Sequence, residues 1–462
     1  MDTEKLPSNP DSQSLEPQAE QLLAAVRDRD AAGAERLLER HPGIARAHLF
    51  AACCAGEADF VEKALAADPQ LAIARHEPDG WAPLLYASSS PLHAGSPERA
   101  RGILRCAELL LERGADPNSH MVWKGPEGEG KLPALYFACV SGNVPVVRLL
   151  LERGADPNDG ESVYHAAELN HCECLELLLA HGAEISGAHP HWGNTPLYFL
   201  AGYKEADRNC PTATEGMRWL LEHGADPNVT SRPTDETPLH RVAAFGRAPA
   251  IVELLLAHGA EVDKPRADGR TAYGLAVRAD NAAVADLLRQ RGADPGKATP
   301  VDELLGACLR ADAAAARTLL ARHPGLPAEL TPEDRQALLL AVEEGREASV
   351  RLMAELGFGL DWEGPWGGTP LHHAAWRGNV AMVRLLLELG APVNVRDRQF
   401  GSSPLGWAGH GSSHCRNADD DYLAVVEALL AAGADRETSI NRWGEPPESM
   451  ATRRVSALLR KA

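Results

Sequence analysis

The stretch LLLERGADPN, Leu109 to Asn118, decides the fold, because the same ten residues return at Leu149 to Asn158. Further copies, progressively looser, run over Leu220 to Asn228, Leu254 to Asp263, Leu287 to Gly296, Leu385 to Asn394 and Leu429 to Arg436. A second motif alternates with this ending and occurs at Thr195-Pro196-Leu197-Tyr198, Thr237-Pro238-Leu239-His240, Thr369-Pro370-Leu371-His372 and Ser403-Pro404-Leu405. An alternation of about 33 residues indicates an array of stacked repeats.

Each motif has a physical role in a helix pair. Thr-Pro begins a short helix, because proline is tolerated in a first helical turn and threonine can cap it. A glycine such as Gly246 or Gly378 then ends that helix. The second helix carries the leucine triplet, and Gly-Ala-Asp ends it because glycine adopts the left-handed conformation of a helix end.

Together these motifs resemble the ankyrin repeat, and Thr369 to Asn394 (TPLHHAAWRGNVAMVRLLLELGAPVN) is close to that family's consensus. The resemblance implies an all-α solenoid of about eleven or twelve helix-turn-helix units with short β-hairpin-like fingers. It also implies that partners bind at the finger tips and along the inner helices, on the concave side.

Composition and charge restrict the function. A net charge of −19 argues against binding nucleic acid, because phosphate recognition needs clustered Lys and Arg. The nine cysteines fall mostly within helical patterns and predict buried thiols instead of disulfides. The sequence shows no apolar leader and no membrane-spanning stretch, which predicts a cytoplasmic protein without membrane contact. We also expect a monomer. Abundant Ala, Gly, Pro and Arg with few Lys is typical of bacterial coding.

The repeats predict six segments. These are a disordered tail over 1–16, degenerate ankyrin units over 17–76, regular repeats over 77–296, degenerate units over 297–360, regular repeats over 361–436 and a C-terminal cap over 437–462. Leu319 to Gly325 (LLARHPG) echoes Leu37 to Gly43 (LLERHPG), which suggests an internal duplication with a joint near Gly296 to Pro300.

Insertions interrupt three units between their two helices, at 88–101, 202–216 and 410–421, and residues 119–130 enlarge one finger. Long loops on a rigid scaffold are often functional. The last insertion holds His410, His414 and Cys415 followed by three aspartates, which could gather a zinc ion. The alternative is a polar loop whose aspartates cap the next helix.

Other chemical signals favour structural roles. His171, Cys172 and Cys174 could bind a metal, but Cys174 has the helical spacing of a core residue. No phosphate loop, nucleophile elbow or zinc-protease motif is present. We therefore predict no catalytic residue, no metal and no cofactor. The resemblance places three histidines in structural positions, where this residue bonds neighbouring backbone: His165, His240 and His372.

Aromatic and arginine residues on the predicted binding face are the candidate contacts, because such residues dominate interface energies. The fingers carry Trp81, Trp192, Trp366 and Phe400, and the inner helices carry Tyr203, Phe245, Arg278, Trp376, Arg377 and His410. The alternative is that finger aromatics pack on the next finger.

The sequence therefore predicts a non-enzymatic scaffold that binds an unknown partner protein through a concave ankyrin groove. Two alternatives stay open. One is a metal-dependent or enzymatic activity carried by the insertions, and the other is a host-directed effector.

Overall fold

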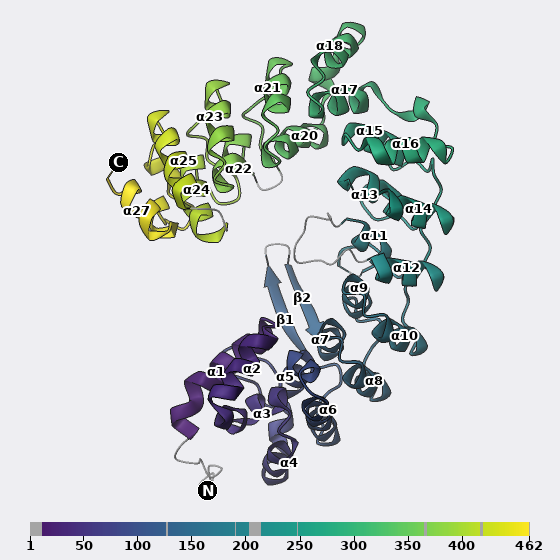
Figure 1. The fold of residues 1–462 in the computed structure, drawn as a ribbon, viewed down its shortest axis with the longest axis vertical. Helices are drawn as coiled ribbons and strands as arrows, with labels where there is room; N and C mark the ends of the chain where they lie inside the picture. Colours follow the sequence, from purple (N-terminus) through teal and green to yellow (C-terminus); the bar gives the residue numbers. More distant parts are fainter. Residues whose placement is uncertain are drawn as a thin grey trace. The chain divides into compact units, whose positions relative to one another are not determined.

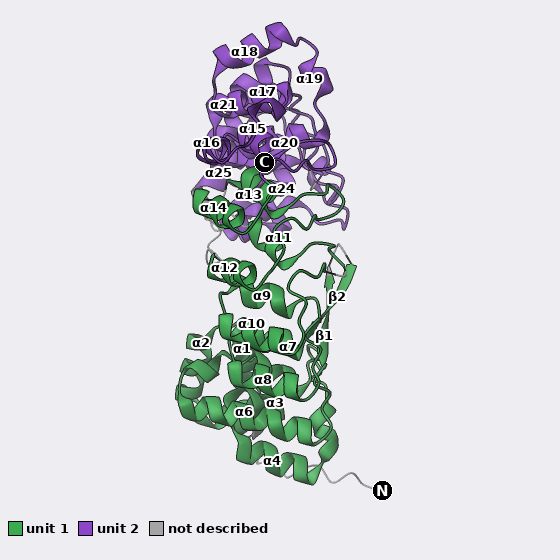
Figure 2. Ribbon diagram, turned by 90° about the vertical axis from the view of Figure 1, so that its right-hand side faces the viewer, with its two compact units in different colours: residues 1–261 green, residues 262–462 purple. Residues whose placement is uncertain are grey.

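The structure is a computed structural model that describes residues 12–125, 128–189, 191–202, 214–246, 248–364, 367–415 and 419–461. The chain divides into two compact units, residues 1–261 and residues 262–462 (Figure 2). The joint predicted near 296–300 falls inside the second unit and stays a prediction.

The described residues of the first unit form a succession of helix pairs and a β-hairpin (Figure 1). Its helices are α1 Ser12–Arg27, α2 Ala31–Arg40, α3 Leu49–Ala55, α4 Ala58–Ala67, α5 Pro83–Ser89, α6 Pro97–Glu112, α7 Ala134–Ser141, α8 Val144–Glu152, α9 Ser162–Glu168, α10 Cys172–Ala180, α11 Pro196–Ala201, α12 Thr214–Glu222, α13 Pro238–Phe245 and α14 Pro249–Ala257. Its 3-10 turns are η1 Pro42–Arg46, η2 Pro69–Ile73 and η3 Pro91–Ala94, and its strands are β1 His120–Gly125 and β2 Gly128–Pro133.

The second unit continues the same scheme. Its helices are α15 Ala272–Arg278, α16 Ala282–Gln290, α17 Pro300–Leu309, α18 Ala313–Arg322, α19 Leu326–Glu329, α20 Pro332–Glu343, α21 Glu347–Glu355, α22 Pro370–Trp376, α23 Val380–Glu388, α24 Pro404–His414, α25 Asp419–Ala431, α26 Pro447–Met450 and α27 Arg453–Leu459, with 3-10 turns η4 Pro295–Lys297 and η5 Glu437–Ser439.

Within each unit the first helices of successive pairs form one row and the second helices another. Helices α3, α5, α7 and α9 pack in order in the first unit, as do α20, α22 and α24 in the second. The second row follows the same order, with α4 on α6 and α23 on α25. The two rows confirm the predicted all-α solenoid of helix pairs.

The predicted helix ends are present in the backbone. Gly114 and Gly154, in the two identical copies of the ending, have φ angles of +93° and +91°. These values lie in the left-handed region that a glycine adopts without steric cost. At a helix start, the Thr195 side chain accepts a hydrogen bond from the backbone N–H of Tyr198 at 3.2 Å.

The asparagine that closes the repeated ending joins one repeat to the next. Asn118 donates from Nδ2 to the carbonyl oxygen of Gly154 at 3.2 Å and accepts from the backbone N–H of Asp156 at 2.9 Å. Asn158, Asn228 and Asn394 make the same pair of hydrogen bonds to the following repeat. The repeated ending therefore supplies hydrogen bonds from one repeat to the next, in addition to ending a helix.

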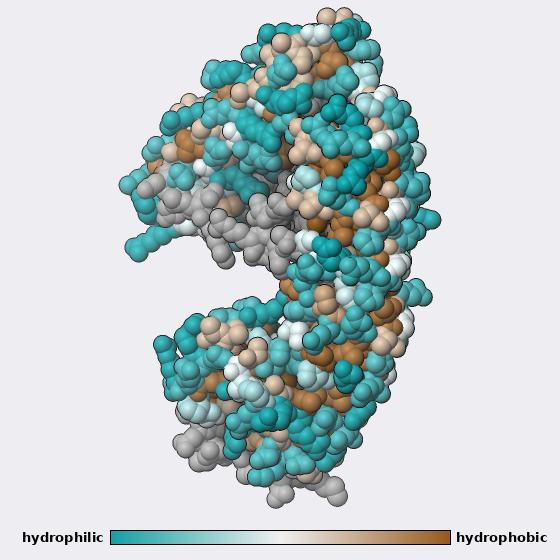
Figure 3. All heavy atoms as spheres, turned by 45° about the vertical axis from the view of Figure 1, so that its right-hand side comes forward, coloured by the Kyte–Doolittle hydropathy of each residue, from teal (hydrophilic) through white to brown (hydrophobic). Residues whose placement is uncertain are grey.

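The core is built from small and branched aliphatic side chains. Leu110, Leu150 and Leu255, from three of the leucine triplets, are fully buried. Hydrophilic residues cover much of the face drawn in Figure 3, and hydrophobic ones lie among them in smaller patches. None of the described helices is both long and apolar enough to cross a bilayer.

The enlarged finger is a β-hairpin. Strands β1 and β2 pair antiparallel, with Trp123 opposite Gly130, and Trp123 is exposed. Two insertions are at least partly ordered: 88–101 contributes η3 and the start of α6, and 410–421 lengthens α24 to His414. Residues 203–213 of the third insertion and residues 416–418 lie outside the described residues.

The segments compared in the duplication hypothesis have the same local structure. Helices α2 and α18 both begin after an aspartate that accepts a hydrogen bond from the third helical residue. Both end at a histidine, with φ/ψ of −135°/70° at His41 and −133°/70° at His323. Helix α1, in contrast, begins at Ser12, within the segment 1–16 that the sequence predicted to be a tail.

Candidate functional site

A pocket of about 710 Å³ lies in the second unit between α22, α24 and the segment before α26. Its lining residues are Glu343, His373, Trp376, Arg377, Phe400, Ser402, Gly406, Trp407, His410, His414, Asn441, Trp443, Glu445, Ser449 and Met450. Four of the ten predicted contact residues meet here: Trp376, Arg377, Phe400 and His410.

Glycines on α24 let the pocket walls approach one another. A β-carbon at Gly411 would lie 2.4 Å from the carbonyl oxygen of Trp376, and one at Gly409 would lie 2.6 Å from the carbonyl oxygen of Pro447. Real β-carbons do not tolerate such contacts. The sequence of α24 therefore permits α22 and α26 to pack against it on either side of the pocket.

The aromatic rings of the pocket face one another at steep angles. Trp376 and Trp407 have ring centroids 6.2 Å apart and planes inclined at 77°. Phe400 lies 5.8 Å from Trp407 at 69° and 6.3 Å from Trp443 at 45°. The rings of Trp376, Phe400 and Trp443 are thus inclined to their neighbours, whereas the His414 ring lies nearly parallel to Trp376, at 22° with centroids 6.4 Å apart. The pocket lies between these rings.

The carboxylate of Asp397 fixes the positions of Trp407 and Phe400 through hydrogen bonds. It accepts hydrogen bonds from the indole Nε1 of Trp407 at 2.9 Å, from the backbone N–H of Ser402 at 2.9 Å and from that of Phe400 at 2.5 Å. Asp397 is 2% exposed. A buried carboxylate with three donors fixes both the finger and the orientation of the Trp407 ring.

Histidines complete the wall formed by α24 and α22. His410 lies 5.2 Å from Trp376 and 4.0 Å from His414 between ring centroids. Burial lowers the pKa of His410, and the neighbouring His414 lowers it further. His373 meets Glu343, with Nδ1 to Oε1 at 3.0 Å.

The other predicted contact residues lie outside this pocket. Trp81 is only 5% exposed and packs on Phe137 of helix α7, with ring centroids 4.6 Å apart, and not on the next finger. Phe245 lies under the guanidinium of Arg241 at 4.4 Å, and Trp192 is 43% exposed in the first unit.

Arg278 serves an internal ion network. It contacts Asp334 at 2.7 Å and Asp302 at 3.5 Å, and both carboxylates are buried. Its side chain is 10% exposed, so little of it faces solvent. Tyr203 and Trp366 lie outside the described residues.

Sequence reasoning missed Trp407 and Trp443. Trp407 stands three residues before His410 on the same helix, and this spacing places both side chains on one helix face. That signal could have identified it. Trp443 lies in the C-terminal cap and is 64% exposed. Nothing in the repeat pattern places it at the pocket.

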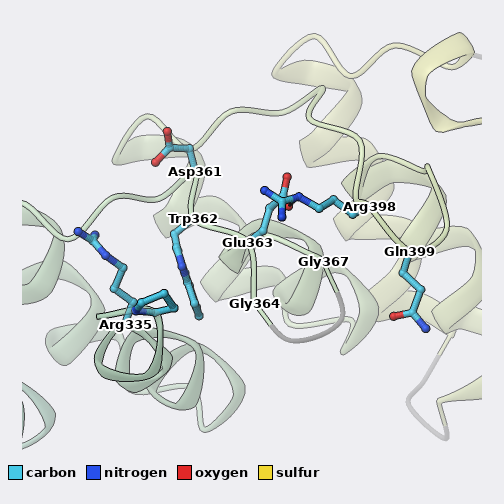
Figure 4. A pocket seen from close by; sticks show the side chains of 9 residues that line it. Arg335, Asp361, Trp362, Glu363, Gly364, Gly367, Arg398 and Gln399 are labelled. Carbon is cyan, nitrogen blue, oxygen red and sulfur yellow. Dashed lines mark ion pairs between the residues drawn. The ribbon is translucent and has the colours of Figure 1, made fainter. Parts of the chain in front are cut away.

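A second cavity of about 740 Å³ lies on the finger side of the same unit. Figure 4 shows Arg398 reaching toward Glu363, with which it forms an ion pair, and Trp362 beside Arg335. This cavity is polar, and its acidic and basic groups partly neutralise each other.

The three histidines predicted to be structural divide into two kinds. His372 accepts from the backbone N–H of Thr369 at 3.0 Å and contacts the carbonyl oxygen of Ser402 through Nε2 at 3.1 Å. His240 accepts from the N–H of Thr237 in the same way. His165 differs, because its ring lies between Glu161 at 3.3 Å and Glu168 at 2.5 Å.

One group among the described residues has the spacing of a metal site, formed by Glu16, Glu20 and His48. His48 accepts a hydrogen bond from the N–H of Ala51 at Nδ1, 3.1 Å, so the neutral ring carries its proton at Nε2. Nε2 is the atom that faces Glu20, at 3.8 Å. A metal at Nε2 would require the other tautomer and would break this helix cap, so the donor set does not fit an ion.

The metal candidates from the sequence have other contacts. His171 meets the carbonyl oxygen of Cys139 at 2.8 Å, and Cys174 is fully buried. His414 meets the carbonyl oxygen of His410 at 2.9 Å, and both line the aromatic pocket. Every cysteine within the described ranges is a free thiol.

Comparison with known proteins agrees with the helix-pair array. The family described as "Ankyrin repeats (3 copies)" matches residues 100–189, 206–299 and 304–397, and "Ankyrin repeat" matches 79–120. Together these matches cover more than half of the chain. The chain therefore belongs to the ankyrin-repeat family, whose members are generally protein-interaction modules.

Curated relatives include three ankyrin repeat and SOCS box proteins. Human protein 11 is 34% identical over 28% of this chain and 36% of its own length, and mouse protein 5 is 35% identical over 29% and 36%. Human protein 16 is 32% identical over 39% and 46%. The chain thus spans less than half the length of these relatives. The crystal structure of the human ASB11 ankyrin repeat domain has a TM-score of 0.41 at 27% identity, covering 54% of this chain and 98% of that one.

Proposed function

We propose that the chain is a non-enzymatic scaffold that binds a partner protein through the aromatic pocket of its second unit. The observation that carries this proposal is the convergence of Trp376, Phe400, Trp407 and Trp443 on one open pocket. Tryptophan is enriched among the residues that dominate binding energy, and such residues cluster in pockets.

Exposure of the rim supports the same proposal. Trp443 is 64% exposed, although a large aromatic side chain gains free energy when it leaves water. It stands beside Phe400, which comes from a finger, and lines the same pocket as Trp376 of α22. A partner segment placed between finger and inner helix would bury Trp443 and Trp376 together.

The test uses a photo-crosslinking amino acid at position 443 of the full-length protein, in lysate of the cells from which the chain comes. A matched probe replaces Trp192, an exposed finger tryptophan of the first unit. We expect a defined protein to be crosslinked from position 443 and not from 192, and its yield to fall when Trp376→Ala is added. Equal crosslinking from both positions, or no loss with Trp376→Ala at unchanged circular dichroism, would overturn the proposal.

A further inference from the structure

The residues that line the same pocket indicate which chemical group it binds. The inference drawn from them rests on the proposed function. We propose that the pocket receives an arginine side chain from a basic segment of the partner polypeptide. Its aromatic walls, its carboxylates and the guanidinium contacts already present in the chain each point to this ligand.

The walls present several aromatic surfaces to one space. A cation within about 6 Å of an aromatic ring centroid is attracted by the negative face of the π system, most strongly for tryptophan. Trp376 and Trp407 stand almost perpendicular, at 77°, and Phe400 meets Trp407 at 69°. A planar cation can therefore lie on one ring while its edge approaches another.

Two carboxylates line the same pocket. Glu445 is exposed and accepts a hydrogen bond from the side chain of Asn441 at 2.9 Å, and a carboxylate has acceptor positions beyond that one. Glu343 also lines the pocket, and its Oε1 lies 3.0 Å from Nδ1 of His373. Because the whole chain carries a net charge of −19, it also attracts a basic segment at long range.

The pocket is also lined by an arginine and by histidines. Arg377 is the one arginine among the lining residues, and it comes from the end of α22. His410 and His414 face the pocket from α24, and the lowered pKa of His410 keeps that ring uncharged at neutral pH. Among the lining residues two carboxylates, Glu343 and Glu445, face the single arginine Arg377, while Arg442 contacts the Trp443 ring from outside this set.

Arginine fits this combination better than lysine. Its guanidinium is planar and weakly hydrated, stacks on aromatic faces and offers a fork of donors to a carboxylate, whereas the lysine ammonium is compact and strongly hydrated. The chain already makes such contacts. The guanidinium of Arg442 lies 5.2 Å from the Trp443 ring centroid, and that of Arg241 lies 4.4 Å from the Phe245 ring centroid.

The size of the pocket suits an arginine within a chain segment. Ligand pockets of about 300–1,000 Å³ are typical of sites that enclose a drug-sized group. The 710 Å³ available here leaves room for the guanidinium and for the residues beside it. Short peptides that differ in one residue therefore test which side chain the pocket binds.

The experiment measures binding of the full-length protein to peptides of the form acetyl-Gly-Ser-Gly-X-Gly-Ser-Gly-amide by calorimetry. X is arginine, lysine or citrulline, the last being a neutral group of nearly the same shape as arginine. We expect the arginine peptide to bind at least fivefold more tightly than either of the others. Glu445→Gln and Trp443→Ala should each weaken it at least threefold, Trp443→Phe should restore most of the binding, and Trp123→Ala, at an exposed tryptophan of strand β1, should have no effect.

Equal affinity for arginine and citrulline peptides, equal affinity for arginine and lysine peptides, or no binding of the arginine peptide at millimolar concentration would each overturn the inference. These results leave the proposed function in place if a partner still crosslinks from position 443. Loss of that crosslink would instead remove the proposed function itself. The two failures are therefore distinguishable.

Discussion

The indole nitrogen of Trp407 donates a hydrogen bond to the carboxylate of Asp397 at 2.9 Å, and this contact ties an inner helix to a finger. Asp397 lies in the finger before α24, whereas Trp407 lies within that helix. Because the same carboxylate also holds the backbone of Phe400 and Ser402, one buried group positions two walls of the aromatic pocket.

Asp397→Ala should therefore destabilise the second unit. Removing the carboxylate leaves three donors without their acceptor in a buried site, and we expect a loss of about 3 kcal/mol in the free energy of unfolding. The measurement is urea unfolding followed by tryptophan fluorescence, with the exposed Glu427→Ala as control. A loss no larger than that of the control would show that water replaces the carboxylate.

Arg278→Ala should lower stability, because this arginine joins repeats through buried carboxylates. Its guanidinium lies 2.7 Å from Asp334, which also contacts Arg270 at 2.9 Å. Since Arg270 remains, we expect a loss of about 2 kcal/mol. Thermal unfolding provides the measurement.

The matched control is Arg289→Ala, whose ion pair with Asp286 is exposed on both sides. Exposed pairs contribute about 0–1 kcal/mol. If both variants unfold at the same temperature, the buried network does not hold the repeats together.

Asn118→Ala should weaken the junction between two successive repeats. The variant loses two hydrogen bonds to the next repeat, one donated to the carbonyl oxygen of Gly154 and one accepted from the backbone N–H of Asp156. We expect the free energy of unfolding to fall by about 1–2 kcal/mol. Hydrogen exchange of the amide of Asp156 should accelerate. The exposed helix variant Glu152→Ala serves as the control and should leave exchange at Asp156 unchanged.

His165 predicts a dependence of stability on pH. Burial alone would lower its pKa, but Glu161 and Glu168 outweigh burial and raise the pKa from 6.5 to about 9. Folding therefore favours the protonated ring. Its contribution is complete below pH 6.5 and is lost as the pH rises through 9.

The measurement is the unfolding midpoint of wild type and His165→Gln between pH 6 and 9.5. Wild type should lose stability over this range by more than the variant does. Parallel profiles would contradict the assignment. On the acid side, burial would raise the pKa of Glu161, but His165 and His189 hold it down to about 2, so its contribution is present above pH 4.5 and is lost as the pH falls through 2.

The sequence by itself determined the repeat. Gly114 can adopt the left-handed conformation of a helix end without steric cost, and Thr-Pro begins a helix through contacts within four residues. Such local rules fix helix boundaries and their succession, so the ankyrin solenoid could be predicted from the letters. The histidines of the Thr-Pro-Leu-His motif followed for the same reason at His240 and His372.

Only the tertiary structure decided which aromatic residues meet. Trp81 and Trp376 both occupy predicted binding positions, but Trp81 packs on Phe137 while Trp376 borders an open pocket. Trp443 reaches that pocket from a cap with no repeat motif. Whether these aromatic side chains are buried or meet at one pocket depends on packing between segments distant in the chain. A local sequence pattern contains no information about that packing.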